Sequence, residues 1–368
     1  MIEVIETFDI ELPSDCAEFN PWEPACLALG TYFLKDADTQ TKEGAVELYC
    51  VRGHNGCDGV VRTGRFTTGA VFDLKWLARD TVVLARADGV IEARSVAPGA
   101  APVCASPAAC GPATYVDCGF DSPDASTATT LATAHSTGRV ALWDAALRAD
   151  ATPLRHWRAH DYEAWVAVHD RACPACVWSG GDDGALKLWD TRAAAGDAAE
   201  IVLTPCARRR FDMGVTAVAP HAQRPLVAVG SYDESLTLWD VRSPRAPLQV
   251  AAAPRDATAG GGVWRLKWHR AHADVLLAAC MHVGYRVFVL HGGDGADQEG
   301  AAAPALTLAA EYRGAHTSLA YGADWMPPSA STDADVLVAA TCSFYDKKLS
   351  FWRMPLPSSS SSFDVLVA

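Results

Sequence analysis

Three side chains of types that enzymes use for proton transfer and charge stabilisation stand beside two short apolar segments. His160 and Glu163 precede the segment 164–168 (AWVAV), and Arg265 lies within the segment 264–268 (WRLKW). A carboxylate at Glu163 could act as a general base on water with His160 assisting it, and Arg265 could stabilise an oxyanion. Glu163 could equally be a solvated surface carboxylate, and Arg265 could be one half of a structural ion pair.

Arg265 needs a partner, because a cation within a strand is costly unless it meets an anion or faces a cavity. Asp73 and Asp324 lie in comparable segments of the chain and are the candidate partners. A bound substrate is the third candidate, and either aspartate could instead contact that substrate. An ion pair is the structural interpretation, and contact with substrate is the functional one.

Aromatic residues adjoin these polar residues. Trp165 and Trp264 are close neighbours of Glu163 and Arg265 in the sequence, and Tyr321 begins a third segment of the same kind. Ring faces gathered at one place would attract a cation, whereas the same rings could instead fill the core between sheets. The three aromatic residues are therefore candidate substrate-binding residues.

One cysteine pair has the spacing of a metal site. Among twelve cysteines, only Cys173 and Cys176 form a CxxC motif. A zinc site needs four ligands, commonly from two such pairs, and no second CxxC or paired-histidine motif is present. We therefore predict an ordinary loop at this motif and no bound metal.

An internal repeat explains why the segments resemble one another. Each copy has a short strand, a tight Asp/Gly turn and a second strand that ends in Trp-Asp. The clearest copies are 135–145 (HSTGRVALWDA), 181–192 (GDDGALKLWDTR) and 230–242 (GSYDESLTLWDVR). Their tryptophans, Trp143, Trp189 and Trp239, are 46 and 50 residues apart. This spacing is near the period of a WD-repeat blade with room for loops.

Weaker copies raise the number of repeats to seven and occupy 44–51, 87–96, 280–290 and 342–354. The sequence therefore predicts an all-β fold, a seven-bladed WD40-type β-propeller over residues 1–355. Innermost strands are predicted at 72–76, 164–168, 214–218, 264–268 and 321–325. We expect residues 4–12 (VIETFDIEL) to pair outside the last blade, so that an N-terminal strand closes the ring.

The remaining segments are predicted to connect or flank the blades. Gly260 to Gly262 would let the chain pass over the preceding blade at positive φ. Ala-, Gly- and Pro-rich inserts at 98–113 and 292–304 are predicted to be surface loops, and 356–368 is a Ser-rich, loose C-terminal tail.

The repeat also gives His160 a structural alternative. A histidine that opens a blade can form a hydrogen-bonded set with the turn aspartate and the tryptophan of that blade. Asp183 and Trp189 stand at those two positions. Either role for His160, structural or catalytic, is compatible with the sequence.

Charge and hydropathy exclude several kinds of partner. With 31 basic and 44 acidic residues, the formal net charge is −13, which disfavours nucleic-acid binding. No apolar run approaches the roughly 20 residues that span a bilayer, and the first residues are acidic where a signal peptide would be basic. We expect a cytoplasmic monomer without membrane or nucleic-acid partners.

Several stretches are not required by repeat geometry. In their order along the chain they resemble the WD-repeat diphthine methylesterase family of diphthamide biosynthesis. The resemblance covers the predicted fourth to seventh blades almost continuously and reaches the N-terminal half thinly through 30–34 and 73–76. The stretches that carry it are 159–167 (AHDYEAWVA), 261–269 (GGVWRLKWH), 276–285 (LLAACMHVGY), 321–325 (YGADW) and 341–352 (TCSFYDKKLSFW).

The resemblance implies hydrolysis of the methyl ester of diphthine methyl ester on elongation factor 2, which gives diphthine and methanol. It also implies that Trp165, Trp264 and Tyr321 face the trimethylammonium group, and that elongation factor 2 and other enzymes of the pathway are partners. The family also carries an older methyltransferase label. The sequence has no βαβ unit or Gly-rich strand-to-helix turn for S-adenosylmethionine, so we expect no cofactor.

The alternative from another class is a non-catalytic WD-repeat adaptor that gathers the pathway's enzymes around elongation factor 2. Propellers commonly serve as docking platforms, and the fold does not distinguish the two functions. An esterase predicts polar residues converging on the propeller axis, whereas an adaptor predicts scattered apolar residues on one face.

Overall fold

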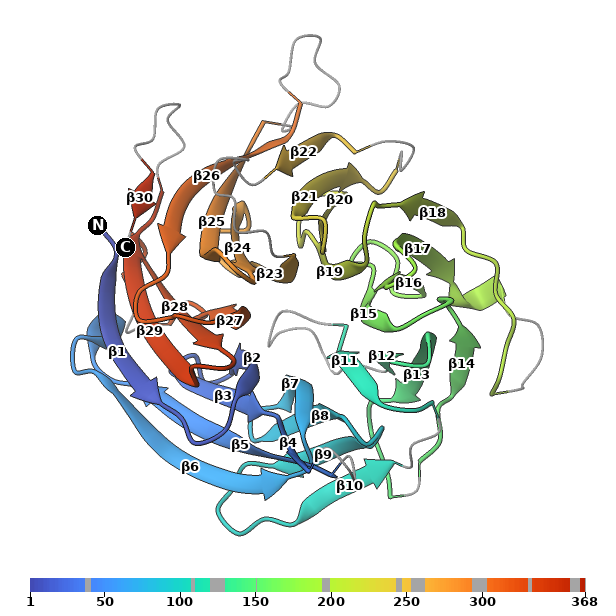
Figure 1. Ribbon diagram of the computed structural model, residues 1–368, viewed down its shortest axis with the longest axis horizontal. Helices are drawn as coiled ribbons and strands as arrows, with labels where there is room; N and C mark the ends of the chain where they lie inside the picture. The colour runs from blue at the N-terminus through green and yellow to red at the C-terminus, as the bar shows by residue number, and fades with distance from the viewer. Residues whose placement is uncertain are drawn as a thin grey trace.

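A computed structural model of the chain contains seven sheets arranged radially about one axis (Figure 1), which confirms the predicted seven-bladed, all-β propeller. The structure describes residues 1–36, 41–106, 110–119, 130–149, 151–193, 199–242, 247–252, 262–292, 303–329, 333–357 and 365–367. The helical segments of these residues are two single 3-10 turns, η1 (His54–Gly56) and η2 (Thr191–Ala193), and neither is long enough to cross a membrane.

Blades 1 to 4 follow one another along the chain, each with its innermost strand first. Blade 1 contains β2 (Ser14–Phe19), β3 (Cys26–Thr31), β5 (Thr41–Val51) and β6 (Val60–Thr68), with β4 (Phe33–Asp36) paired to β5. Blade 2 contains β7 (Val71–Ala78), β8 (Thr81–Arg86), β9 (Ile91–Ser95) and β10 (Pro102–Ser106). Blade 3 contains β11 (Ala113–Asp117), β12 (Thr130–His135), β13 (Arg139–Asp144) and β14 (Arg155–Arg158). Blade 4 contains β15 (Ala164–His169), β16 (Cys176–Gly181), β17 (Ala185–Asp190) and β18 (Ala207–Arg210).

Blades 5 to 7 complete the ring. Blade 5 contains β19 (Val215–Pro220), β20 (Leu226–Ser231), β21 (Ser235–Asp240) and β22 (Gln249–Ala252). Blade 6 contains β23 (Val263–Trp268), β24 (Val275–Cys280), β25 (Gly284–His291), β26 (Ala305–Tyr312) and the short β30 (Leu366–Val367). Blade 7 contains β27 (Ala320–Trp325), β28 (Val336–Ser343), β29 (Lys348–Pro355) and β1 (Glu3–Asp9). The five predicted innermost strands are confirmed as β7, β15, β19, β23 and β27.

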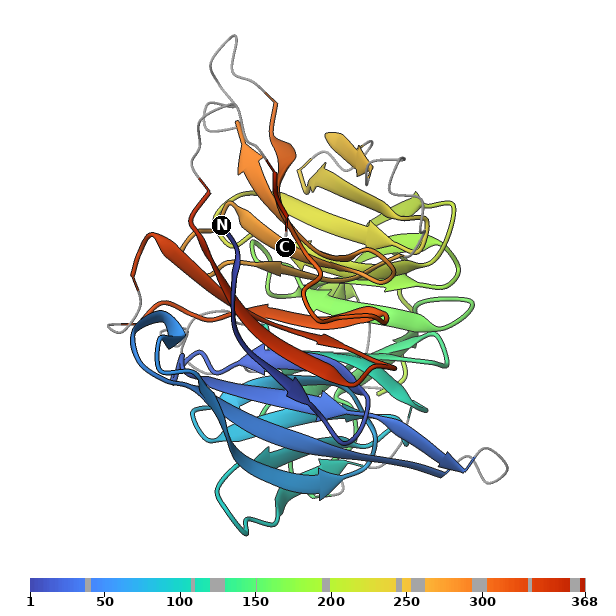
Figure 2. The ribbon, with the colours of Figure 1, turned by 60° about the vertical axis from the view of Figure 1, so that its left-hand side comes forward.

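The two ends of the chain meet in blade 7, as predicted. β1 pairs antiparallel with β29, with Val4 opposite Trp352 and Phe8 opposite Leu349. Figures 1 and 2 show β1 lying along the outer side of this last blade. The pairing covers an edge that would otherwise be exposed, because β1 supplies the outer strand that the C-terminal part of the chain lacks.

The core lies between neighbouring sheets. Between blades 1 and 7, Phe19 and Leu27 pack with Leu349 and Phe351, and all four side chains are fully buried. The buried indole of Trp143 in blade 3 donates a 2.8 Å hydrogen bond to Thr133, which satisfies a polar group at this depth. Close packing of this kind keeps the innermost strands at defined positions around the axis.

Three connecting segments differ from the expectations or lie outside the described residues. The insert 98–113 was predicted as a loop, but Pro102–Ser106 forms β10 and pairs with β9, so that prediction is wrong for these residues. Residues 107–109 and 293–302 of the inserts and 358–364 and 368 of the tail lie outside the described residues. Leu366 and Val367, from the predicted loose tail, pair in parallel with β26.

Gly262 is required for a reason other than the predicted one. Its φ is not positive, and its neighbours Gly260 and Gly261 lie outside the described residues. A Cβ atom at Gly262 would stand 2.5 Å from Cα of Tyr232. Glycine is therefore needed because the chain passes against the preceding blade with no room for a side chain.

Candidate functional site

The seven innermost strands share one irregularity near the end at which they begin, here called the upper end of the axis. In each strand the pairing register skips one residue, so that its side chain leaves the regular alternation of the sheet. The skipped residues, here called the upper ring, are Asp15, Phe72, Thr114, Trp165, Thr216, Trp264 and Tyr321. Bulges of this kind redirect side chains and are common at the rims of closed sheets and beside active sites.

The predicted aromatic residues meet at the upper ring. The ring centroids of Trp165 and Trp264 are 5.6 Å apart although the residues belong to blades 4 and 6, and Trp264 is 5.0 Å from Tyr321 of blade 7. Tyr232, in the turn after β20, adds a fourth ring 6.1 Å from Trp264 and 6.4 Å from Trp165. Blade 5 lies between blades 4 and 6, so Trp165 and Trp264 can approach each other this closely only if both side chains point toward the axis. These four half-buried residues are called the aromatic cluster.

Further rings continue the aromatic surface around the axis. Phe344 lies 5.3 Å from Tyr321 and 6.0 Å from Tyr32, and Tyr32 stacks on Phe72 at 4.9 Å. These residues belong to blades 7, 1 and 2. The aromatic surface at the upper end therefore extends over most of the ring.

Asp15 is the carboxyl group of the upper ring and was not among the residues predicted from the sequence. Its side chain is only 3% exposed, and burial raises its pKa to about 7. The positive charge of Arg265 opposes this shift and the negative charge of Asp73 reinforces it. The indole N–H of Trp264 is close enough to lower the pKa of Asp15 as well, although it makes no hydrogen bond of good geometry.

Arg265 forms an ion pair across the axis. Its Nη2 lies 2.9 Å from Oδ1 of Asp73, and its guanidinium carbon is 5.0 Å from the ring centroid of Tyr115. Arg265 belongs to blade 6, whereas Asp73 and Tyr115 belong to blades 2 and 3. The predicted pairing therefore forms with Asp73. Asp324 instead accepts a 2.8 Å hydrogen bond from the amide of Phe19, nearer the lower end.

His160 lies inside blade 4 and not at the axis. Its Nδ1 is 2.8 Å from Oδ1 of Asp183, and its Nε2 is 2.8 Å from the hydroxyl of Ser179, which also accepts a hydrogen bond from Trp189. Burial lowers the pKa of His160. Both ring nitrogens are engaged, so this geometry matches the structural alternative.

Glu163 lies at the upper lip of blade 4. Its carbonyl oxygen accepts a 2.8 Å hydrogen bond from the amide of Asp182, and the Asp182 carboxylate accepts a 3.1 Å hydrogen bond from Trp165 Nε1. Burial raises the pKa of Tyr232, and the charges of Asp182, Asp15 and Glu163 raise it further. The structure thus brings Glu163 into electrostatic range of the aromatic cluster.

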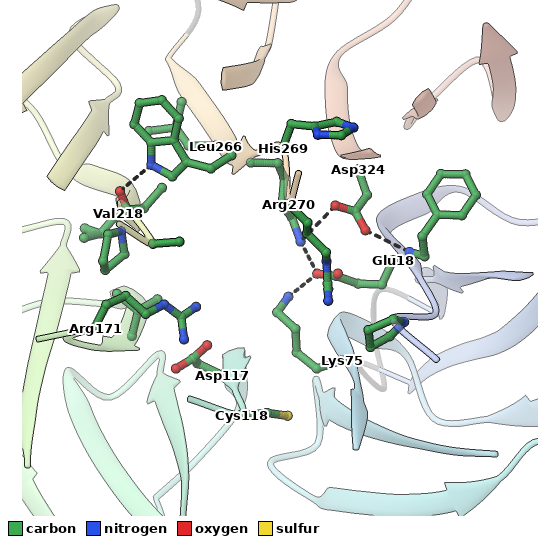
Figure 3. A pocket seen from close by; sticks show the side chains of 18 of the residues that line it. Glu18, Lys75, Asp117, Cys118, Arg171, Val218, Leu266, His269, Arg270 and Asp324 are labelled. Carbon is green, nitrogen blue, oxygen red and sulfur yellow. Dashed lines mark hydrogen bonds and ion pairs between the residues drawn. The ribbon is translucent and has the colours of Figure 1, made fainter. Parts of the chain in front are cut away.

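A pocket of about 200 Å³ opens at the opposite, lower end of the axis (Figure 3). Lys75 and Lys267 both contact the Glu18 carboxylate, and Arg171 lies beside Asp117. Burial alone would raise the pKa of Glu18, but the two lysines outweigh it and lower the pKa. Burial raises the pKa of Asp324 to about 6; the charge of Lys267 opposes this shift and the Glu18 carboxylate reinforces it.

No group of three or more potential metal ligands gathers among the residues that the structure describes. The predicted CxxC residues form a pair, with the sulfur atoms of Cys173 and Cys176 2.7 Å apart. Two ligands alone do not make a tetrahedral zinc site.

The fold and the upper end together define a closed WD-type propeller that presents aromatic rings and buried ionisable groups at one end of its axis. No model of a protein family matches the chain. Among curated proteins, human diphthine methyltransferase is 31% identical over 356 residues, which cover 87% of this chain and 74% of the human protein. The chain therefore belongs to the diphthine methyltransferase family, which confirms the resemblance found in the sequence.

Two further relatives agree with this placement. The diphthine methyltransferase of Schizosaccharomyces pombe is 27% identical over 357 residues, 93% of this chain and 94% of that protein. The diphthine methyltransferase homolog of Dictyostelium discoideum is 37% identical over 205 residues, 55% of this chain and about half (53%) of that protein.

Proposed function

We propose that this protein acts in diphthamide biosynthesis and hydrolyses the methyl ester of diphthine methyl ester on elongation factor 2, giving diphthine and methanol. Its relatives from human and Schizosaccharomyces pombe are named diphthine methyltransferases, which supports a substrate of the diphthine type. The observation that carries the proposal is the aromatic cluster with carboxylates around it at the upper end of the axis.

The chemistry of the substrate matches this arrangement. In diphthine methyl ester one carbon atom carries both the trimethylammonium group and the esterified carboxyl. Ring faces attract a quaternary ammonium, and nearby carboxylates strengthen the attraction. The four rings of Trp165, Tyr232, Trp264 and Tyr321 supply the faces, while Asp182 and Glu163 supply negative charge.

The same site contains a cation for the reaction itself. Ester hydrolysis creates negative charge on the former carbonyl oxygen, and a fixed positive charge nearby lowers the barrier. Arg265 supplies that charge below the aromatic cluster and is held in place by Asp73 and by the carbonyl of Phe72, 3.3 Å away. Water is the only other reactant that this reaction needs.

The test uses the purified protein and elongation factor 2 that carries diphthine methyl ester. Without S-adenosylmethionine, the modified peptide should lose the mass of one methylene unit, and methanol should appear in equal amount. In heavy-oxygen water the label should enter the new carboxyl group and not the methanol. A substrate that binds but keeps its mass would refute hydrolysis and favour the adaptor function.

A further inference from the structure

Asp15 is the one residue of the upper ring that carries a carboxyl group, and it is buried. We infer that Asp15 is the general base that activates the hydrolytic water and, once protonated, the general acid that completes methanol release. This inference rests on the proposed ester hydrolysis and names the residue that performs its proton transfers.

The first support is the placement of Asp15 on β2. The register of β2 with β3 pairs Ser14 with Thr31 and Cys16 with Gly30, which leaves Asp15 out of the ladder. The equivalent residues of blades 4, 6 and 7 form most of the aromatic cluster. Repeat geometry therefore places the Asp15 carboxyl at the level where those rings meet.

The second support is what the other small polar members of the ring do. The hydroxyl of Thr114 donates a hydrogen bond to the carbonyl of Ala164, and that of Thr216 donates one to the carbonyl of Val263. Both threonines thus join neighbouring innermost strands. Within the described part of the chain no salt bridge occupies the Asp15 carboxyl, which leaves it available for chemistry.

The third support is the central position of Asp15. Burial raises the pKa of Tyr32, Tyr232 and Tyr321, and in each case the negative charge of Asp15 raises it further. These tyrosines come from blades 1, 5 and 7, so Asp15 lies within electrostatic range of opposite sides of the ring. A trimethylammonium group in the aromatic cluster would bring the adjoining ester beside this carboxyl.

The fourth support is the protonation state that burial produces. A general base works best when its pKa is near the working pH, and the pKa of Asp15 is raised to about 7. Glu163, the base predicted from the sequence, is only partly buried at the lip. Burial therefore distinguishes Asp15 from that candidate.

The reaction balances with water as the second reactant. Asp15 accepts one proton from water while the water oxygen bonds to the ester carbonyl carbon and the carbonyl π electron pair moves to its oxygen. Collapse of this intermediate breaks the bond between carbon and the methoxy oxygen. Protonated Asp15 then donates its proton to that oxygen, methanol leaves, and the new carboxylic acid loses its proton to solvent.

The test compares Asp15→Asn, Glu163→Gln and wild type, with Asp190→Asn as a matched control. Asp190 pairs with Arg192 at 2.8 Å at the far end of β17, away from the upper ring. Hydrolysis of the methyl ester on elongation factor 2 is followed by methanol release between pH 5.5 and 9, a range of about 1.5 to 2 units on each side of the expected midpoint. Wild-type kcat/KM should rise with pH through a midpoint near 7 and level off about one unit above it, because the ionised base is the active form.

Asp15→Asn should lower kcat at least about 100-fold with little change in KM, and the rise near pH 7 should disappear. The control should keep the wild-type profile, and circular dichroism should show that each variant is folded. If wild type hydrolyses the ester and Asp15→Asn keeps the same profile, the assignment of Asp15 is wrong. Loss of the pH dependence in Glu163→Gln instead would also overturn it. If wild type itself shows no hydrolysis, the proposed function fails.

Discussion

Replacing Asp15 by asparagine should make the protein more stable at high pH. In an unfolded chain this carboxyl ionises near its ordinary pKa of about 4, whereas in the folded protein burial raises the pKa to about 7. Between these values the folded state keeps a proton that the unfolded state has released. The stability of the wild-type protein therefore falls as pH rises from about 4 to about 7. The folded state is free of the cost of an ionised, buried Asp15 relative to the unfolded state only below about pH 4.

The size of the effect follows from the shift. About three pKa units, at about 1.4 kcal/mol each, correspond to about 4 kcal/mol of destabilisation by ionised Asp15 above pH 8. Asparagine has nearly the same shape and no charge to desolvate. Asp15→Asn should therefore gain up to about 4 kcal/mol at pH 8.5 and be close to wild type at pH 4.5.

Urea unfolding at a series of pH values measures this difference, with Asp190→Asn as the control for loss of a half-buried carboxylate far from the upper ring. A gain that grows with pH would connect the burial of Asp15 to its proposed use as a base, since active sites often retain groups that cost stability. If Asp15→Asn is less stable than wild type at pH 8.5, or if the difference does not vary with pH, Asp15 ionises normally and the reasoning fails.

Three further predictions concern Trp264 and Arg265 near Asp15 and Ser179 inside blade 4. Trp264→Leu should raise KM for the modified elongation factor about 5- to 30-fold with a smaller effect on kcat, because a ring face is lost; an unchanged KM would place the ammonium elsewhere. Arg265→Met should move the midpoint of the kcat/KM profile to higher pH, because the charge of Arg265 lowers the pKa of Asp15. The same change should lower the free energy of urea unfolding by about 2–3 kcal/mol, because Asp73 loses its partner. A midpoint that stays or falls would contradict the electrostatic link between Arg265 and Asp15. Ser179→Ala should cost about 1–3 kcal/mol in thermal or urea unfolding while leaving the pH profile intact, because it removes the shared partner of His160 and Trp189; a changed profile would return His160 to the catalytic site.

Local patterns sufficed for the elements that repeat. A hairpin with an Asp/Gly turn and a terminal Trp-Asp is encoded within a dozen residues, so the number of blades and most innermost strands could be inferred. The closing strand could also be inferred, because residues 4–12 precede the seven repeats and closure of the ring needs one further strand. Pro102–Ser106 was missed because its Ala- and Pro-rich surroundings resemble a loop, and only pairing with β9 makes it a strand.

The innermost strand of blade 1 shows where local patterns fail. Ser14–Phe19 (SDCAEF) contains three polar residues, yet all six of its residues are buried. A buried strand is normally recognised by its apolar residues, so this one gave no signal. Aligning residues 14–19 with the innermost strands of the other blades would have found it, and Asp15 would then have fallen at the position of Trp165, Trp264 and Tyr321.

The amino-acid pattern thus determined the number of blades and the candidates on blades 4, 6 and 7, because each depends on residues close together in the chain. It also indicated the closure of the ring, although the paired strands β1 and β29 are distant in the sequence. The tertiary structure decided that Arg265 pairs with Asp73 and not Asp324, that His160 is held inside its blade, and that Asp15 stands in the upper ring. Closure of the ring brings position 15 to the same level as position 264, and burial at that place sets its pKa. Neither the proximity nor the loss of water can be read from neighbours in the sequence.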